Sequence, residues 1–197
     1  LLSQHAQVAR DASLVSTNVT LGGLFHKGSI KATLSDPGAN VQLNGISYLD
    51  GQQFVDHHTS QDHKTTDAVS DLLYVNILDD TSRSVYGGTI LVEQDAQRSN
   101  AYQQNRNLML GSGPRADSIP RLEIMADDVR CTHGATTSTV DPAQLYYLNS
   151  RGLNRDDART MIINGTIEPV LDRIPSTVVA DAVRTALQEK IQSTSSN

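Results

Sequence analysis

The sequence predicts a mainly β chain, built as a stacked β-solenoid, that ends in a small α-helical domain. Short runs rich in Val, Ile, Thr and Ser, broken by Gly, Asn, Asp and Pro, fill most of the first 139 residues. Such runs are typical of strands. Aromatic residues make up only 4% of the chain and Trp is absent, so the large aromatic core of a sandwich is not favoured. After Thr139 the pattern changes to helix caps and helical spacing.

Residue patterns alone leave a β-sandwich and a barrel open beside the solenoid. Too few helix-period segments lie between the strands for right-handed β-α-β crossovers, which argues against a doubly wound sheet. The small, regular side chains favour the solenoid, although its repeat period is too degenerate to be read from the sequence.

The strands are expected in six runs. These cover residues 13–21, 29–34, 40–49, 68–78, 84–93 and 121–132. In the fifth run Ile90 and Val92 alternate with Thr89 and Leu91, so both faces are largely apolar. A strand apolar on both faces must be covered on both.

Three helices are expected after the strands. Asp141 and Pro142 provide an N-cap and a proline at the first helical position, and Gly152 provides a C-terminal cap. Asn154 caps a second helix, which should kink or break at the glycine and proline at positions 165 and 169.

The third helix should begin at Pro175-Ser176. Its apolar stripe would consist of Val179, Val183, Ala186 or Leu187, and Ile191. Residues 192–197, rich in Ser, are expected to fray. The predicted organisation is therefore a β core over residues 1–139 and a helical domain over residues 140–197.

Charge and composition narrow the classes of partner. Asp and Glu outnumber Lys and Arg by 22 to 16, for a net charge of -6, which argues against nucleic acid or an anionic membrane as the main partner. The single cysteine cannot form an internal disulfide, and no apolar run approaches the roughly 18 residues of a membrane span. A cytoplasmic location is expected. Because no Met opens the chain, a fragment of a longer polypeptide is also expected.

Asp56, His57 and His58, with His63 close behind, form the densest group of possible metal ligands. The pattern resembles the Asp-His-His motif of metal-dependent phosphoesterases, which would make the chain a stand-alone hydrolase with divalent cations. Such enzymes need further Asp clusters that the sequence lacks. On a strand, Asp56 and His58 would share one face and His57 the other, so a hydrogen-bonded ladder is the simpler interpretation.

Two shorter patterns are weaker indications. Gly87-Gly88 lacks the spacing of a phosphate-binding loop, so we expect close strand packing there. Cys131 and His133 stand two apart on an expected strand and should project from one face. Two ligands are half of a tetrahedral site, and the other half would come from elsewhere in the chain or from a second subunit. A buried cysteine that behaves as a small hydrophobe is the alternative.

The second half of the chain contains a series of ordered motifs. They are Gly88-x-Ile90-x-Val92, Asn105-x-Asn107-Leu108 to Leu110, Pro120-x-Leu122-Glu123-Ile124, Asp127-Asp128-Val129, Cys131-x-His133-Gly134-Ala135-Thr136 and Tyr147-Leu148-x-Ser150-Arg151-Gly152. With these motifs the chain closely resembles the SufB/SufD family of iron–sulfur cluster assembly proteins. The Cys-x-His-Gly-Ala-Thr form is similar to the SufD member, because SufB carries a Glu-His-Glu version. Family members are longer, so the chain resembles the C-terminal half of one.

The resemblance implies a right-handed parallel β-helix followed by a helical domain, and a scaffold rather than an enzyme. It implies pairing with a SufB-like paralogue through the end of the β-helix, with a nascent iron–sulfur cluster at that interface near His133 and Cys131. It also implies docking of a SufC-like ATPase on the helical domain, where Arg151, Arg155 and Arg159 lie near helix ends, and a flavin somewhere in the complex. An isolated chain should dimerise or aggregate, with a homodimer through the partner edge as one outcome, since a cut β-helix exposes unpaired backbone.

Overall fold

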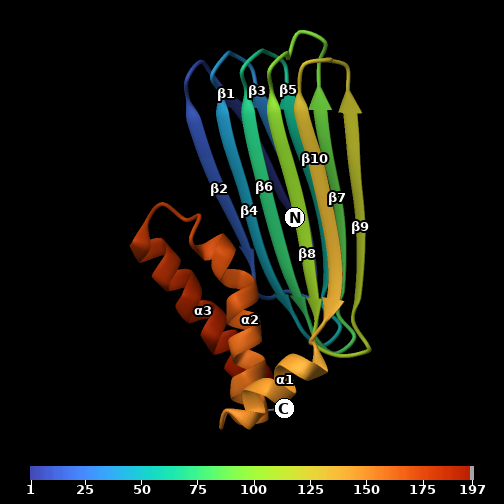
Figure 1. The fold of residues 1–197 in the computed structure, drawn as a ribbon, viewed down its shortest axis with the longest axis vertical. Helices are drawn as coiled ribbons and strands as arrows, with labels where there is room; N and C mark the ends of the chain where they lie inside the picture. The colour runs from blue at the N-terminus through green and yellow to red at the C-terminus, as the bar shows by residue number, and fades with distance from the viewer. Residues whose placement is uncertain (196–197) are drawn as a thin grey trace.

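The computed structural model describes residues 1–195, and within them ten strands and three helices follow one another in the order that Figure 1 shows. The strands are β1 (Leu2–Val8), β2 (Ser13–Thr20), β3 (Phe25–Leu34), β4 (Asn40–Leu49), β5 (Phe54–His63), β6 (Val69–Leu78), β7 (Arg83–Val92), β8 (Asn100–Met109), β9 (Arg115–Ile124) and β10 (Arg130–Thr139). The helices are α1 (Pro142–Ser150), α2 (Arg155–Leu171) and α3 (Thr177–Ser195).

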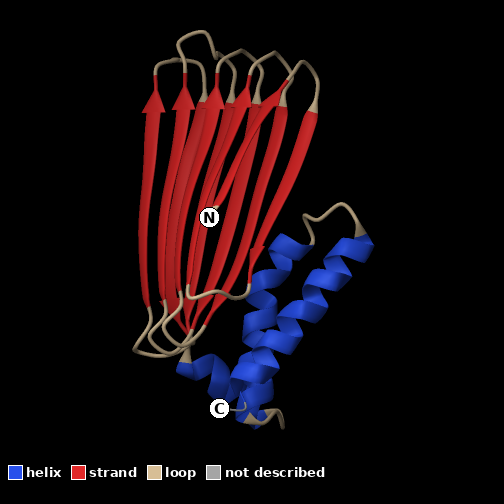
Figure 2. Cartoon of the chain, turned by 180° about the vertical axis from the view of Figure 1, so that it is seen from behind, coloured by secondary structure: helices blue, strands red, loops and turns tan. Residues whose placement is uncertain are grey.

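The strands form two parallel five-stranded sheets. Sheet A has the order β1-β3-β5-β7-β9 and sheet B the order β10-β8-β6-β4-β2, so the chain changes sheet after every strand and two strands complete one turn. The chain rises through sheet A and descends through sheet B while it advances from β1 to β10, which makes the coil right-handed (Figure 1; Figure 2). The β-solenoid is confirmed, and the sandwich and barrel alternatives are excluded.

Most side chains between the sheets are small or branched, and each inward row repeats one turn later. The rings of Tyr74 and Tyr86 are buried among them. Much of the interior is polar: Asn76 donates to Asn107 at 2.8 Å, and Gln61 donates to Ser70 at 2.7 Å. These bonds pair amide nitrogens that would otherwise be costly to bury.

The helices cover the outer face of sheet B. One apolar cluster joins outward side chains of β4, β6 and β8 to α2 and α3; it includes Ile46, Tyr48, Leu73, Val75, Ile77, Leu108, Ile163, Ile167, Val170, Leu171, Leu187 and Ile191. Ion pairs at the rim add to this contact, among them Lys190 with Asp50 at 2.6 Å. The strands of sheet B can therefore be apolar on both faces, whereas none of the described helices lies over sheet A (Figure 2).

The helix caps follow the sequence prediction. The Asp141 side chain accepts from the Ala143 N–H at 2.8 Å, and the Asn154 side chain accepts from the Asp157 N–H at 2.8 Å. Gly152 has a φ of +95°, the left-handed conformation that favours glycine at a helix end. None of the described helices is long and apolar enough to cross a membrane.

Four details of the prediction are wrong. Residues 121–132 are not one strand, because β9 ends at Ile124 and β10 begins at Arg130. Helix α2 does not break at Pro169, which lies close enough to its end that few backbone hydrogen bonds are lost. Val179 is half exposed and Ala180 is buried in its place. The tail is helical through Ser195, and its last two residues lie outside the described part.

Candidate functional site

The solenoid is open at its C-terminal end. Strands β9 and β10 are the last strands of their sheets, and no further strand pairs with them within residues 1–195. Most of β10 is exposed, in contrast to β8 one turn before it. An exposed strand edge of ten residues offers a row of backbone donors and acceptors on which another chain can add a strand.

Cys131 and His133 lie on β10 in register with Ala101 and Gln103 of β8, whose side chains point into the solenoid. The prediction that they share one face is therefore confirmed. Cys131 is half buried against an apolar cluster that includes Ala101, and this burial raises the pKa of its thiol. His133 is exposed. At neutral pH the cysteine is thus a packed, protonated thiol and the histidine is free to contact a partner.

The two residues do not form a metal site by themselves. Among the described residues, no group of three or more His, Cys, Asp or Glu side chains is placed to hold a metal ion. Any complete site at this edge would therefore need ligands from a second chain.

The group around His57 is divided between the two faces of β5. His57 points inward, where its ring lies 5.3 Å from that of His26, and burial lowers its pKa to about 4. His63 is also buried, with its Nε2 atom 2.7 Å from the Ser70 hydroxyl. Burial lowers its pKa to about 4 as well.

Asp56 and His58 lie on the opposite, outer face of the strand. The Asp56 carboxylate is 3.1 Å from the Lys27 ammonium and 2.9 Å from His58 Nε2. Because the four predicted ligands point to different sides, they cannot converge on one metal ion. The ladder interpretation therefore accounts for this segment better than a hydrolase site does.

The three arginines expected to dock an ATPase differ in their surroundings. Arg151 lies over the Tyr147 ring, 5.3 Å from its centroid. Arg155 is exposed at the start of α2, whereas Arg159 forms an ion pair with Asp79 in the turn after β6 and so holds α2 to the solenoid. Arg159 is therefore already engaged within the chain.

Next to these arginines, α1 and α2 form an apolar groove of about 460 Å³. Its walls include Tyr147, Leu148, Met161 and Ile162, and α1 contains no buried residue. The sequence analysis did not predict this groove. The adjacent Tyr146 and Tyr147 on α1 were a signal of an exposed apolar surface.

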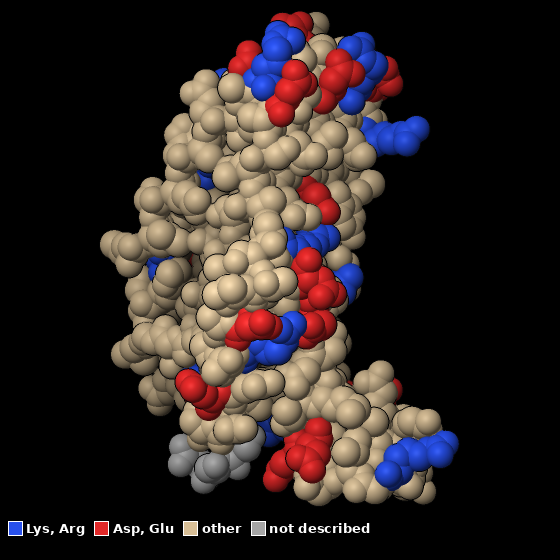
Figure 3. Space-filling view, turned by 90° about the vertical axis from the view of Figure 1, so that its left-hand side faces the viewer, with Lys and Arg blue, Asp and Glu red and all other residues tan. Residues whose placement is uncertain are grey.

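Charged groups on the surface are mixed in sign. On the side that Figure 3 shows, acidic and basic side chains lie next to each other, beside a broad surface without charge. No extended basic patch appears on that side, which agrees with the charge balance of the sequence.

A family model described as the SufBD core domain of SUF system FeS cluster assembly matches residues 1–166. The chain belongs to the SufBD core family. It is similar to an iron–sulfur cluster assembly SufBD family protein of Mycobacterium leprae, with 31% identity over 100% of this chain and 52% of that protein. It is also 35% identical to the iron–sulfur cluster assembly protein SufD of Escherichia coli, over 79% of this chain and 37% of SufD.

The match to the SufBD core runs through the whole solenoid, α1 and most of α2. It therefore includes the open edge and the groove between α1 and α2. The chain spans about half or less of the length of these relatives. Both relatives are named as iron–sulfur cluster assembly proteins.

Proposed function

We propose that this chain is a SufD-like scaffold subunit that pairs with a SufB-like paralogue through the open edge of β9 and β10. The observation that carries the proposal is the uncapped last turn, which presents His133 at an edge able to accept a strand. Iron and sulfide are the cargo assembled at this junction, and the chain itself performs no catalytic step. When no paralogue is present, a second copy would take the same edge.

The docking of a SufC-like ATPase is the second part of the proposal. The groove between α1 and α2 supports it, because half-exposed Tyr147 and Met161 line the groove and the cation of Arg151 lies over the Tyr147 ring. Aromatic, Met and Arg side chains are enriched at the centres of protein interfaces. We propose that the complex is cytoplasmic. A flavin bound by the complex is not assigned to any residue of this chain.

Substitution of His133 with alanine is expected to lower the iron and sulfide assembled on the complex by about tenfold or more, the scale seen when metal sites lose a supporting group. Cys131→Ala should have a smaller effect, because the raised pKa keeps that thiol protonated. Thr132→Ala is the matched control, since Thr132 is exposed on the same strand but points to the other face. The measurement is iron and acid-labile sulfide per purified complex, together with size-exclusion chromatography. A normal cluster yield from the His133→Ala complex would contradict the role of His133.

Tyr147→Glu and Met161→Glu are expected to weaken capture of the ATPase by about tenfold or more, since each places a charge in an apolar interface. Val178→Glu is the control, because Val178 is 77% exposed at the beginning of α3 and distant from α1 in Figure 1. Binding is measured with immobilised chain and purified ATPase. Deletion of the helices would be less informative, since it would expose the outer face of sheet B. Undiminished capture by both groove variants would show that the ATPase binds elsewhere.

A further inference from the structure

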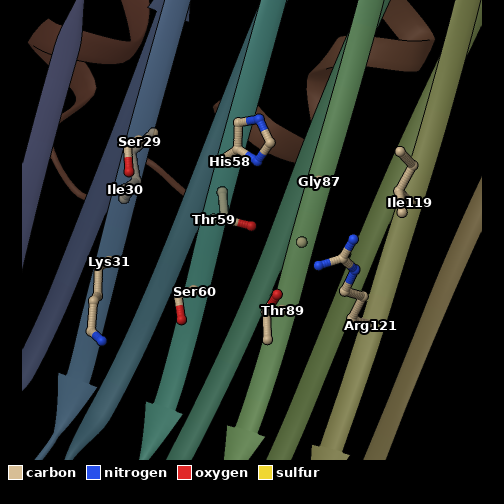
Figure 4. A pocket seen from close by; sticks show the side chains of 11 residues that line it. Ser29, Ile30, Lys31, His58, Thr59, Ser60, Gly87, Thr89, Ile119 and Arg121 are labelled. Carbon is tan, nitrogen blue, oxygen red and sulfur yellow. The ribbon is translucent and has the colours of Figure 1, made fainter.

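A trough of about 270 Å³ crosses the outer face of sheet A, on the side of the molecule that the helices leave uncovered. It runs over the middle of β3, β5, β7 and β9. A sheet face is normally filled by its outward side chains, but Gly87 supplies none here. A Cβ atom at Gly87 would lie 2.9 Å from Nδ1 of His58. The missing side chain therefore leaves room for the His58 ring to lie against Gly87, where the ring forms one wall of the trough (Figure 4).

The lining of the trough favours anions. None of its eleven residues is Asp or Glu, although the chain as a whole carries a net charge of -6. Lys31 is already paired with the buried carboxylate of Asp62, and His58 with Asp56. Arg121 is exposed and forms no ion pair with any described residue, so it supplies the uncompensated positive charge.

Neutral donors lie on one side of this charge, because Arg121 comes from the edge strand β9. Figure 4 shows Arg121 extending from β9 toward β7, with Thr89 below the hollow and Ser29 on the far side. The hydroxyls of Ser29 and Thr89 have no hydrogen-bond partner within residues 1–195. A guanidinium group beside free hydroxyls matches the geometry of a phosphate, because the guanidinium can donate two parallel hydrogen bonds.

We propose that this trough binds a small phosphomonoester, with its phosphate on Arg121 and Thr89 and its body over Gly87 beside the His58 ring. The volume is at the lower end of ligand pockets, so a phosphate with one planar group fits and a dinucleotide does not. The site lies on the outer face of sheet A, on the side of the solenoid away from the groove between α1 and α2, and its residue Arg121 belongs to the edge strand β9.

Titration calorimetry of the protein with phenyl phosphate, inorganic phosphate, phenol and benzoate tests the proposal. Phenyl phosphate should bind in a saturable way and more tightly than inorganic phosphate, and phenol should not bind. Benzoate that binds as tightly as phenyl phosphate would contradict the phosphate assignment. Equal affinity for phenyl phosphate and inorganic phosphate would contradict the position of the body.

Two variants locate the site. Arg121→Gln should weaken phenyl phosphate binding by at least about tenfold, and Arg10→Gln, which removes an exposed charge in a turn, should not. Gly87→Leu should abolish binding by filling the hollow, whereas Gly22→Leu, where no atom lies within 4 Å, should not. Circular dichroism checks that each variant is folded. An Arg121→Gln protein with the parental affinity, or a parental protein that does not bind phenyl phosphate, would overturn the proposal.

Discussion

Lowering the pH from 7 to 4.5 is expected to reduce the free energy of unfolding by several kcal/mol, because two histidines are buried as neutral rings. The side chains of His57 and His63 are 2% and 0% exposed. Burial is the main cause of the lowered pKa at both positions, and the neighbouring His26 adds to it at His57. Each imidazole has a pKa of about 4 in the folded chain, against 6.5 in the unfolded chain.

The sign follows from which state binds the protons. Between pH 6.5 and 4 the unfolded chain is protonated at these histidines and the folded chain is not, so stability falls as the pH falls. Above pH 6.5 both states are neutral and the two groups contribute no pH dependence. One unit of pKa difference corresponds to about 1.4 kcal/mol, so the two histidines together remove about 5 kcal/mol by pH 4.5. Carboxylates with a lowered pKa, such as Asp67 beside Arg98, reduce the free energy of unfolding only below about pH 4.

Urea unfolding followed by circular dichroism at a series of pH values measures this effect. The variants His57→Phe and His63→Gln replace each ring with a group that does not titrate, so each should flatten the pH dependence between 6.5 and 4 by about half. The double variant should leave little of it. A double variant with the parental slope would show that other groups cause the acid sensitivity.

Gly45→Ala is expected to destabilise the chain by about 3 kcal/mol, the upper range for a side chain forced into a packed core. A Cβ atom at Gly45 would lie 2.4 Å from two ring atoms of Tyr74 and 2.8 Å from a third. Tyr74 cannot move aside, because its buried ring packs against His57 and Tyr86 at centroid distances of 5.4 Å and 5.6 Å.

Gly134→Ala is the matched control, since its Cβ atom would have no neighbour closer than 4.0 Å. That change should be neutral or slightly stabilising, because glycine loses more conformational entropy in a strand than alanine does. Combining Gly45→Ala with Tyr74→Leu should recover part of the loss, which a double-mutant cycle measures by urea unfolding. A loss below about 0.5 kcal/mol for Gly45→Ala would mean that the ring is free to shift.

The sequence predicted the strands that contain a continuous run of apolar residues. β4 and β6 were found within one residue of their ends, because β-branched and aromatic residues fill them. β8 was missed since its inward positions include Gln103, Asn105 and Asn107. The amides of Asn105 and Asn107 bond to groups one turn away, as in the bond between Asn76 and Asn107, and a partner 31 residues distant leaves no local pattern.

The candidate site was predictable only in part. A spacing of two residues was enough to put Cys131 and His133 on one face, but their different exposure depends on β10 being the last strand of its sheet. The glycine pair shows the same limit. Gly88 packs closely, as expected, since a Cβ atom there would lie only 2.4 Å from the side-chain nitrogen of Gln103. Gly87 also packs closely, 2.9 Å from the His58 ring by the same measure, but it faces outward and lines the trough. The glycine pair alone does not tell which side of the sheet each residue faces.

The helices that cover sheet B follow the solenoid in the sequence, so they are synthesised after it. Until Ile191 leaves the ribosome, the apolar outer face around Ile46, Val75 and Leu108 has nothing to cover it. The turns themselves can pair as they emerge, because each contacts only its neighbours. Synthesis from Leu108 to Ile191 takes on the order of ten seconds at ordinary elongation rates. During that interval the partly made solenoid exposes this apolar face to solvent. Chaperones that bind exposed apolar surface can therefore act on the protein at this stage.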